Sequence, residues 1–460
     1  MKKLNACVMA AFAALSLHAA EISQVIVRQQ WPWSTDVKVE YRIVNVDRPV
    51  NLTVRAYNGD VELDSTALAG AMRGDLFGIA EDGVGSFVID PVKAFGTAKL
   101  ALANFSVKLS TVDAQEGINE VLYRVVDLNN GSIVDVTRAD FYGNKYGTYE
   151  TSYTAAGGTN TKLSEVFIWT GVTNDPAYVT SKLVLRRIPA KSFGPWLMGA
   201  AGTPTYTPSL WSGATQHLVS LTEDYFISVF PVTQAQYEKV TGSRGFGDYT
   251  DKTAYPLNDA YPALAEWWDI RGQESWPESH NVDMAKFFGL LRAKTGGKVL
   301  FDFTTEAQWE FACRAGWDVN ECYLGYASLG YSALLLQGWC YRPDKDRGND
   351  GTMHPVGKLK PTAFGIYDML GNCREWCLDL GYKASSDYPW TSKTEAETNP
   401  LGATTAEGYS VSGHYTHVVR STACNQTYEQ NNICVRVHRT SRGFNGDKYY
   451  FGFRVGCGAD

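Results

Sequence analysis

Two carboxylates seven positions apart, Asp368 and Glu375, lie in the segment of this chain whose residue types are best suited to chemistry. Gly371 stands between them, and a glycine lets the chain bend without steric cost to a β-carbon. With the main-chain oxygens of Gly371 and Cys373, the two carboxylates supply the oxygen ligands that Ca2+ prefers. The sequence therefore predicts a calcium site formed by Asp368, Gly371, Cys373 and Glu375. The alternative is structural: Asp368 caps a turn and Glu375 pairs with an arginine.

Cysteines are the second chemically active group. The chain has nine, of which Cys7 lies in an N-terminal segment that reads as a signal peptide. Removal of the signal peptide would leave eight cysteines, and an even number of cysteines in an exported protein favours disulfide bonds over zinc. The remaining eight all lie in the second half of the chain, so the first half must be held together by its core alone. They are Cys313, Cys322, Cys340, Cys373, Cys377, Cys424, Cys434 and Cys457.

The segment Gly365–Trp376, GIYDMLGNCREW, resembles the central signature of the formylglycine-generating enzyme, or sulfatase-modifying factor, family. Further blocks follow in family order over residues 183–460, and this resemblance implies a C-type-lectin-like α/β domain low in regular secondary structure. It also implies a disulfide bond between Cys313 and Cys457. The further blocks are LVLRRIPAKSF (183–193), MG (198–199), FPVTQAQY (230–237), TEAQWEFACRAG (305–316), NPLG (399–402), VVR (418–420) and FGFRV (451–455).

The resemblance also implies an activity. Enzymes of this family bind Cu(I) through two cysteines and use dioxygen to oxidise a sulfatase cysteine, in a Cys-x-Pro-x-Arg segment, to formylglycine. A soft d10 ion of this kind prefers thiolate ligands. Cys434 matches the second family cysteine, because Arg436 and Arg442 follow it at the family spacings. Cys434 and Cys424 are thus the candidate catalytic residues, and Arg436 and Arg442 the candidate substrate-binding residues.

Around Cys424 the chain departs from the family pattern. Ala423 replaces the active-site serine, His438 takes the place of an arginine, and nine residues separate Cys424 from Cys434, more than in the family. Cys424 and Cys434 therefore form either a copper pair or a structural disulfide bond.

Other metal-binding patterns are weaker. His414 and His417 are three positions apart and would point to opposite faces of a strand, which favours solvent-facing or core-edge histidines over a metal cluster. The acidic, glycine-bearing segment 341–353 has Pro355 where an EF-hand starting at Asp344 requires a glutamate.

Local signals predict the elements that position these residues. Thr233 with Gln236, and Thr305 with Gln308, are capping boxes that begin two helices. A third helix is expected over 282–294, where apolar residues share one face and a glycine pair follows. Long loops make up most of the rest of residues 183–460.

Residues 21–182 show short runs of alternating apolar and polar residues with turn signals between them. Asn129-Asn130-Gly131 is a hairpin signal between two such runs. We expect an antiparallel β-sandwich of immunoglobulin or fibronectin type III kind here. The fold class predicted for the whole chain is therefore α+β, with this sandwich followed by the lectin-like domain at 183–460.

The N-terminus and composition limit location and partners. Residues 1–20 have the basic, apolar and small-residue parts of a signal peptide, and no later run is long enough to span a membrane. The protein is therefore expected to be secreted or periplasmic. A net charge of −7 argues against nucleic acid as a partner.

Two functions remain open from the sequence. The first is an oxidase that installs formylglycine on co-exported sulfatases. The second is a catalytically silent, lectin-like member whose 420–450 segment, rich in Asn, Tyr, Arg and Gly, binds a protein or glycan ligand, with the first domain as a stalk.

Overall fold

The computed structural model divides the chain into two compact units, of which the first comprises residues 1–120 and 137–146 and the second residues 121–136 and 147–460. The residues that the structure describes are 20–29, 32–98, 104–152, 154–155, 158–159, 166–199, 216–244, 256–315, 336–341, 351–382, 395–411, 413–426, 436–440 and 450–459.

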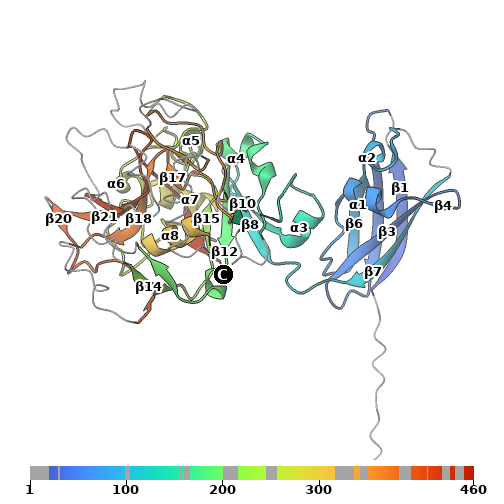
Figure 1. Ribbon diagram of the computed structural model, residues 1–460, viewed down its shortest axis with the longest axis horizontal. Helices are drawn as coiled ribbons and strands as arrows, with labels where there is room; N and C mark the ends of the chain where they lie inside the picture. The colour runs from blue at the N-terminus through green and yellow to red at the C-terminus, as the bar shows by residue number, and fades with distance from the viewer. Residues whose placement is uncertain are drawn as a thin grey trace, which may run out of the picture. The chain divides into compact units, whose positions relative to one another are not determined.

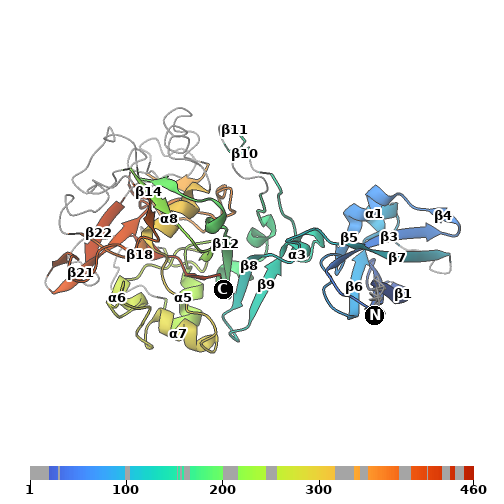
Figure 2. The ribbon, with the colours of Figure 1, turned by 90° about the horizontal axis from the view of Figure 1, so that it is seen from below.

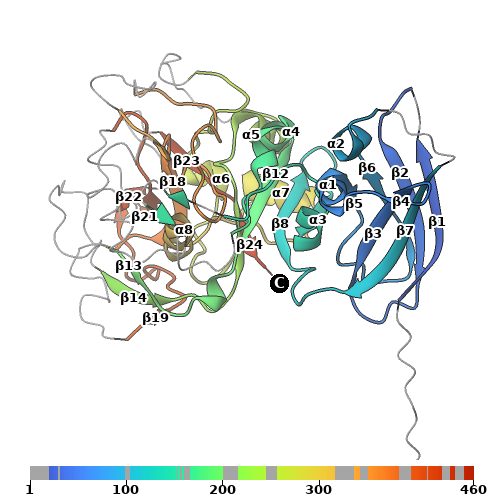
Figure 3. The same cartoon turned by 45° about the vertical axis from the view of Figure 1, so that its right-hand side comes forward.

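The first unit contains two antiparallel sheets (Figure 3). One has the order β1 (Glu21–Gln29), β2 (Val37–Val44), β6 (Gly83–Ile89), β5 (Met72–Gly74). The other has the order β4 (Val61–Glu62), β3 (Val50–Asn58), β7 (Phe105–Asp113). The short helices are α1 (Ser65–Ala71), α2 (Pro91–Phe95) and α3 (Arg138–Tyr142).

Alternation along the strands builds the core of this unit. On β2, Val37, Val39, Tyr41 and Ile43 are buried while the residues between them are partly or fully exposed. Buried and more exposed residues also alternate along β3, and both sheets contribute to one apolar cluster. The predicted strand periodicity is confirmed, whereas the immunoglobulin or fibronectin type III topology stays a prediction.

A five-stranded sheet forms the base of the second unit, and its central strands lie side by side in Figure 1. Its order is β24 (Gly456–Gly458), β15 (Tyr225–Ser228), β12 (Lys182–Ile188), β8 (Val121–Asp127), β9 (Ile133–Thr137). The predicted hairpin at Asn129-Asn130-Gly131 joins β8 to β9, with Gly131 at φ +76°.

The division of the chain differs from the boundary predicted at residue 182. Strand β8 pairs with β12 from Lys182–Asp127 to Arg186–Tyr123, so residues 121–136 belong to the second unit. The reason is that β8 completes a sheet with strands that follow it, and a strand's own pattern does not specify which sheet it joins.

Both faces of this sheet are covered. Along β15, Tyr225 and Ile227 point into one apolar cluster and Phe226 into another. The Phe226 face packs against α5 (Gln234–Thr241), α6 (Trp267–Ile270) and α7 (Phe287–Lys294). The opposite face packs against α8 (Glu306–Arg314). Three smaller helical turns lie in the connections: α4 (Ala177–Thr180) and the 3-10 turns at Thr170–Thr173 and Ala190–Ser192.

A second sheet carries two of the candidate site residues, Glu375 on β18 and Arg436 on β22 (Figure 2). Its order is β20 (Ser410–Val411), β21 (His414–Arg420), β18 (Arg374–Leu380), β23 (Phe451–Phe453), with β22 (Arg436–Thr440) also paired to β21. All residues of β18 are buried, since Trp376 and Leu378 enter one core cluster and Cys377 the other. Smaller sheets are formed by β13 (Trp196–Met198), β14 (His217–Ser220) and β19 (Glu397–Thr398), by β16 (Gly338–Trp339) with β17 (Leu370–Gly371), and by β10 (Thr154–Ala155) with β11 (Gly158–Thr159).

Local helix signals are confirmed. Thr233 and Thr305 each accept a hydrogen bond from the backbone of the glutamine three residues on, and each glutamine side chain reaches back to the cap. The third predicted helix begins later than expected, at Phe287 rather than 282. Over its described residues the protein is mixed α/β, mostly strands with few helices, and no helix in those segments is long and apolar enough to cross a membrane.

Candidate functional site

The segment from Asp368 to Asn372, which includes β17 and leads into β18, owes its shape to left-handed backbone conformations. Asp368, Gly371 and Asn372 have φ values of +55°, +78° and +60°. At Gly371 a β-carbon would lie 1.9 Å from the carbonyl oxygen of Trp339, because β17 pairs closely with β16. Only glycine fits this position, which confirms its predicted role as the turn residue.

Asp368 is buried, and only one of its two carboxylate oxygens has a hydrogen-bond partner. Its Oδ2 accepts a hydrogen bond of 2.7 Å from the Gly357 N–H, whereas Oδ1 has no hydrogen-bond partner. Burial raises the pKa of Asp368 to about 6, although the Gly357 N–H and the Arg454 guanidinium act in the opposite direction. A buried carboxylate oxygen without a partner lowers the stability of the fold, unless the oxygen is protonated or binds a water molecule or a cation.

Glu375 lies in the same region but has different partners. Arg454 Nε lies 3.0 and 2.9 Å from the two carboxylate oxygens, and the indole Nε1 of Trp309 donates to Oε2 at 2.5 Å. The other nitrogens of Arg454 donate to the carbonyl oxygens of Ser228, Val229 and Tyr367. The structural alternative, in which Glu375 pairs with an arginine, is therefore confirmed.

The four residues of the predicted calcium site are neighbours in the fold, but their oxygen atoms do not form one set of metal ligands. Glu375 is neutralised by Arg454, and the Gly371 carbonyl accepts the Cys373 N–H at 2.8 Å. Across the described segments, no three His, Cys, Asp or Glu side chains gather as a metal-binding cluster. Of the two carboxylates, Asp368 has a buried oxygen, Oδ1, without a hydrogen-bond partner, whereas both oxygens of Glu375 are bonded.

A buried ion network under β21 was not predicted from the sequence. Arg420 donates to Glu306 Oε1 at 2.8 Å and to Glu310 Oε2 at 2.5 Å, and Glu310 Oε1 also accepts from Arg314 and from the Gly199 N–H. Burial alone would raise the pKa of Glu310, but Arg314 and Arg420 lower it to about 2. The i, i+4 spacing of Glu310 and Arg314 was a visible signal, whereas Arg420 comes from a strand more than a hundred positions away.

This network fixes the start of the loop that carries Cys424. Just after Arg420, Ser421 Oγ accepts the Gly371 N–H at 3.0 Å, and the Cys424 N–H donates to the Asn372 carbonyl at 3.1 Å. Gln426 Oε1 accepts the Ala423 N–H and Arg374 Nε. Cys424 is 1% exposed, in an apolar cluster with Leu264, Met353, Cys373, Ala423 and Tyr450.

The other candidate catalytic and substrate-binding residues are only partly described. Cys434 and Arg442 lie outside the described residues. Arg436 begins β22 and is paired with Arg420 on β21. Both candidate cysteines thus belong to the single connection that runs from the end of β21 to the start of β22.

The Cys313–Cys457 disulfide is wrong. Cys457 has a free thiol that hydrogen-bonds to Arg124, and burial raises its pKa to about 12. Cys457 is paired with Phe226 and faces the same core cluster, whereas Cys313 packs in the cluster on the other face of the sheet. Cys373 and Cys377 are also free thiols. Burial, with Glu375 nearby, raises the pKa of Cys373 well above its usual range.

His417 differs from the expected solvent-facing or core-edge position. It is fully buried and stacks on Trp267 with ring centroids 3.8 Å apart. Burial lowers its pKa to about 3, so the imidazole is neutral at physiological pH. Its role is packing.

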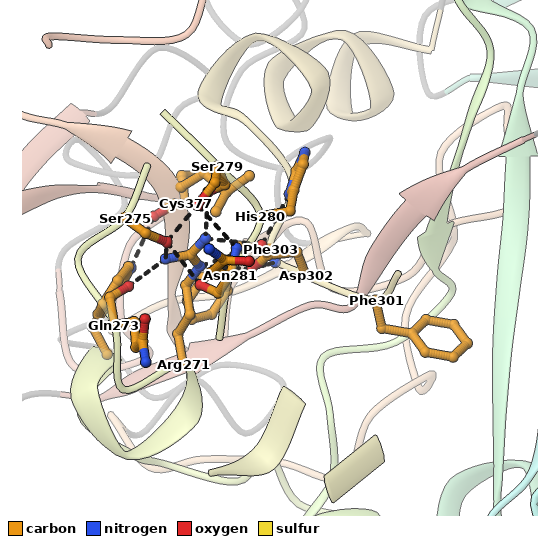
Figure 4. Close-up of polar contacts among 12 residues, drawn as sticks. Arg271, Gln273, Ser275, Ser279, His280, Asn281, Phe301, Asp302, Phe303 and Cys377 are labelled. Carbon is orange, nitrogen blue, oxygen red and sulfur yellow. Dashed lines mark hydrogen bonds and ion pairs between the residues drawn. The ribbon is translucent and has the colours of Figure 1, made fainter. Parts of the chain in front are cut away.

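A second polar cluster surrounds Arg271 (Figure 4). Arg271 is fully buried and holds Asp302 through Nε and Nη2 at 3.0–3.3 Å, while its remaining contacts are with Gln273, Ser275 and the Ser279 carbonyl. His280 Nδ1 lies 3.0 Å from Asp302 Oδ2. Apart from Asp302, the groups that accept hydrogen bonds from Arg271 lie in the loop between α6 and α7. Arg271 therefore holds this loop in a compact conformation. No sequence motif marks this cluster, because Arg271 and Asp302 are 31 positions apart.

Comparisons with known proteins identify a family and several relatives of this chain. A family model described as "Sulfatase-modifying factor enzyme 1-like domain" matches residues 192–455. The formylglycine-generating enzyme of Thermomonospora curvata is 29% identical over 224 residues, covering 45% of this chain and 68% of that protein. That of Mycobacterium tuberculosis is 30% identical over 185 residues, covering 32% of this chain and 60% of that protein.

Two solved structures are also similar to this chain. PvdO from Pseudomonas aeruginosa is 19% identical with a TM-score of 0.39, covering 60% of this chain and 94% of that one. Treponema denticola variable protein 1 is 18% identical with a TM-score of 0.41, covering 60% and 95%. Since the family model spans more than half of the sequence, the chain belongs to the sulfatase-modifying factor family.

Proposed function

We propose that this chain is an exported oxidase that converts a cysteine in a Cys-x-Pro-x-Arg segment of a sulfatase to formylglycine. In the overall change the –CH2–SH carbon loses two electrons and becomes an aldehyde, the sulfur leaves as hydrogen sulfide, and dioxygen supplies the aldehyde oxygen and is otherwise reduced to water, with the remaining two electrons coming from an external thiol reductant that is oxidised to a disulfide. The observation that carries the proposal is the placement of the loop after β21. Arg420 is clamped by Glu306 and Glu310, and the connection that follows it contains both Cys424 and Cys434.

Copper is the cofactor that this function requires. The donor set fits a soft ion, because Cys424 is buried beside further sulfur atoms in its cluster. Cys424 and Cys434 would hold Cu(I), which when bound supplies the activation of dioxygen. The residues of the chain supply the rest: the Cys424 loop excludes water, and Arg436 and Arg442 are proposed to bind the sulfatase segment.

A second candidate function has its own supporting observation. Ala423 stands where the family has a serine, and it is buried along with Cys424, so neither side chain is presented to solvent. A catalytically silent member that binds a protein or glycan through the 420–450 segment would account for both facts. The first unit, proposed to be an immunoglobulin-like sandwich, would then act as a spacer.

The experiment that separates the two functions is an aldehyde assay. Copper-loaded protein is incubated in air with a Cys-x-Pro-x-Arg peptide, and the product is captured with a hydroxylamine probe and identified by mass. We expect aldehyde from the wild-type chain and none from Cys434→Ser or Cys424→Ser. Cys457→Ala, a thiol remote from the loop, serves as the matched control and should keep the activity.

Absence of aldehyde from copper-loaded, folded protein would reject the oxidase and favour the ligand-binding function. Activity that survived Cys434→Ser would reject the proposed catalytic cysteines.

Calcium remains part of the proposal, with Asp368 as its main ligand. The support is Asp368 Oδ1, a buried carboxylate oxygen without a hydrogen-bond partner. The carbonyl groups of Gly371 and Cys373 are the proposed main-chain ligands, and Glu375, held by Arg454, would contribute charge rather than a free oxygen. Removing Ca2+ with EDTA should lower the melting temperature, because a ligand bound only by the folded state stabilises it. Asp368→Asn should abolish the difference. An EDTA-insensitive melt of protein that was loaded with calcium would reject the site.

Export is proposed from the N-terminal residues. Mass spectrometry of the protein from its native host should show cleavage near Ala19 or Ala20 and a secreted or periplasmic location. An intact Met1 would contradict it.

A further inference from the structure

Two loops of the second unit meet to form one surface. The first comprises residues 272–285, between α6 and α7, and the second comprises residues 401–411, just before β21. Trp276 Nε1 donates to the Leu401 carbonyl at 2.8 Å, and Thr405 Oγ1 donates to Glu278 Oε1 at 2.8 Å. These two bonds join the loops side by side.

This surface lies at the opposite end of β21 from the loop that carries Cys424. The 401–411 loop is bonded to the start of the strand, because the Tyr409 carbonyl accepts the Thr416 N–H at 2.8 Å. Cys424 follows the end of the strand, and seven extended residues span about 20 Å. The surface is therefore separate from the candidate catalytic loop.

Each of the two loops is fixed by its own hydrogen bonds. Arg271 holds the first in the compact conformation shown in Figure 4. In the second, Glu407 Oε2 accepts the Thr404 N–H and hydroxyl at 3.1 and 2.8 Å, and the Tyr415 hydroxyl donates to the Thr405 carbonyl at 3.0 Å. A surface that is already ordered loses little conformational entropy when it binds a partner.

The two loops carry negative charge. Neither contains a lysine or an arginine, whereas together they contain Glu274, Glu278, Asp283 and Glu407. Glu278 and Glu407 are exposed, and in the described part of the chain their side chains bond to threonines rather than to basic residues. The hydrogen bond from Thr405 lowers the pKa of Glu278, so its carboxylate is charged at neutral pH.

The same surface exposes two large apolar side chains. Leu401 is 43% and Tyr409 38% exposed. Leu401 belongs to the residue whose carbonyl holds Trp276, and Tyr409 follows Glu407 by two positions. Burial of these side chains against a partner would remove apolar area from water, and tyrosine is enriched among the residues that anchor protein interfaces.

We propose that this surface, formed by residues 272–285 and 401–411, docks a basic segment of a partner protein, in which arginine or lysine side chains alternate with apolar ones. The charges of Glu278 and Glu407 would attract and orient the cationic side chains, while Leu401 and Tyr409 pack against the apolar ones. An anionic glycan or lipid would be repelled by the same carboxylates. The inference goes beyond the proposed function, because it involves neither copper nor the candidate cysteines.

The test uses a fluorescein-labelled peptide of arginine, leucine and glycine, titrated with the full-length protein and followed by fluorescence anisotropy. We expect saturable binding that weakens with added salt, and no binding of a peptide with glutamate in place of arginine. The double variant Glu278→Gln/Glu407→Gln, whose amides can still accept the threonine hydrogen bonds, should bind the peptide at least about tenfold more weakly. Tyr409→Ala should weaken binding by about the same factor.

The matched control is Asp60→Asn/Glu116→Gln, which changes the net charge equally at two exposed positions of the first unit. It should bind like wild type. A benzophenone group on the peptide should form cross-links within residues 272–285 or 401–411, which identifies the surface independently of the variants. Absence of saturable binding, equal weakening in the two double variants, or cross-links confined to other segments would each overturn the inference.

Discussion

Removing the charge of Glu310 should destabilise the second unit by about 3 kcal/mol at neutral pH. Glu310 is fully buried and accepts from Arg314, Arg420 and the Gly199 N–H. Its pKa is lowered from 4.5 to about 2, which corresponds to about 3 kcal/mol of stabilisation when the carboxylate is charged. The cost of breaking a buried ion pair, about 3–5 kcal/mol, is of the same size. Glu310→Gln keeps the shape and removes the charge.

The contribution of Glu310 to the free energy of unfolding should depend on pH. Because the pKa of Glu310 is lower in the folded than in the unfolded state, its contribution is present above about pH 4.5 and is lost as the pH falls towards about 2. The free-energy difference between wild type and Glu310→Gln should therefore be largest at pH 7 and shrink steadily below pH 4.5. At neutral pH the Glu310→Gln substitution should lower the melting temperature of the second unit by roughly 4 °C.

The assay is urea unfolding at pH 7, 5 and 3.5, followed by tryptophan fluorescence and fitted for the transition of the second unit. Asp269→Asn is the control, since it removes the Lys286–Asp269 pair, whose aspartate is 53% exposed. An exposed pair contributes less than about 1 kcal/mol. A Glu310→Gln cost no larger than that of Asp269→Asn, or a difference that does not change between pH 7 and 3.5, would refute the reasoning.

Three further results are expected. Between pH 6.5 and about 3, His417 should cost about 1.4 kcal/mol of stability per pH unit as the pH falls, because only the unfolded chain binds its proton; His417→Phe should flatten this part of the pH profile, and an unchanged slope would contradict it. Gly371→Ala should cost about 2 kcal/mol more than Gly242→Ala in thermal melts, because both glycines have φ near +78° but only at Gly371 would the new β-carbon meet the Trp339 carbonyl. In denaturant without reductant, Cys457 should be fully alkylated by iodoacetamide, and protection that needs reduction to lift would show that it is bridged.

Features whose causes lie within a few residues could be read from the sequence. The capping boxes at Thr233 and Thr305 begin helices as predicted, since a cap and its partner are three positions apart. The hairpin at Gly131 forms where a left-handed residue was required. Gly371 is likewise a turn residue, and the alternative in which Glu375 pairs with an arginine came from charge alone.

Features that depend on which distant segments meet could not be read in this way. No spacing in the sequence pairs Glu375 with Arg454, Arg420 with Glu310 or Asp302 with Arg271, because each pair is formed by separate elements. The Cys313–Cys457 disulfide was implied by the family resemblance, but in this chain the two cysteines pack in the clusters on opposite faces of one sheet.

The sequence by itself thus determined the family of residues 192–455, the strand periodicity of the first unit and the local ends of the main helices. Only the tertiary structure decided that Cys373 lies beside Cys424, that Asp368 keeps an unpartnered oxygen while Glu375 does not, and that residues 121–136 belong to the second unit. The physical reason is that caps, turns and periodicity act over a few residues, whereas burial and ion pairing are set by the packing of strands that are far apart in the chain.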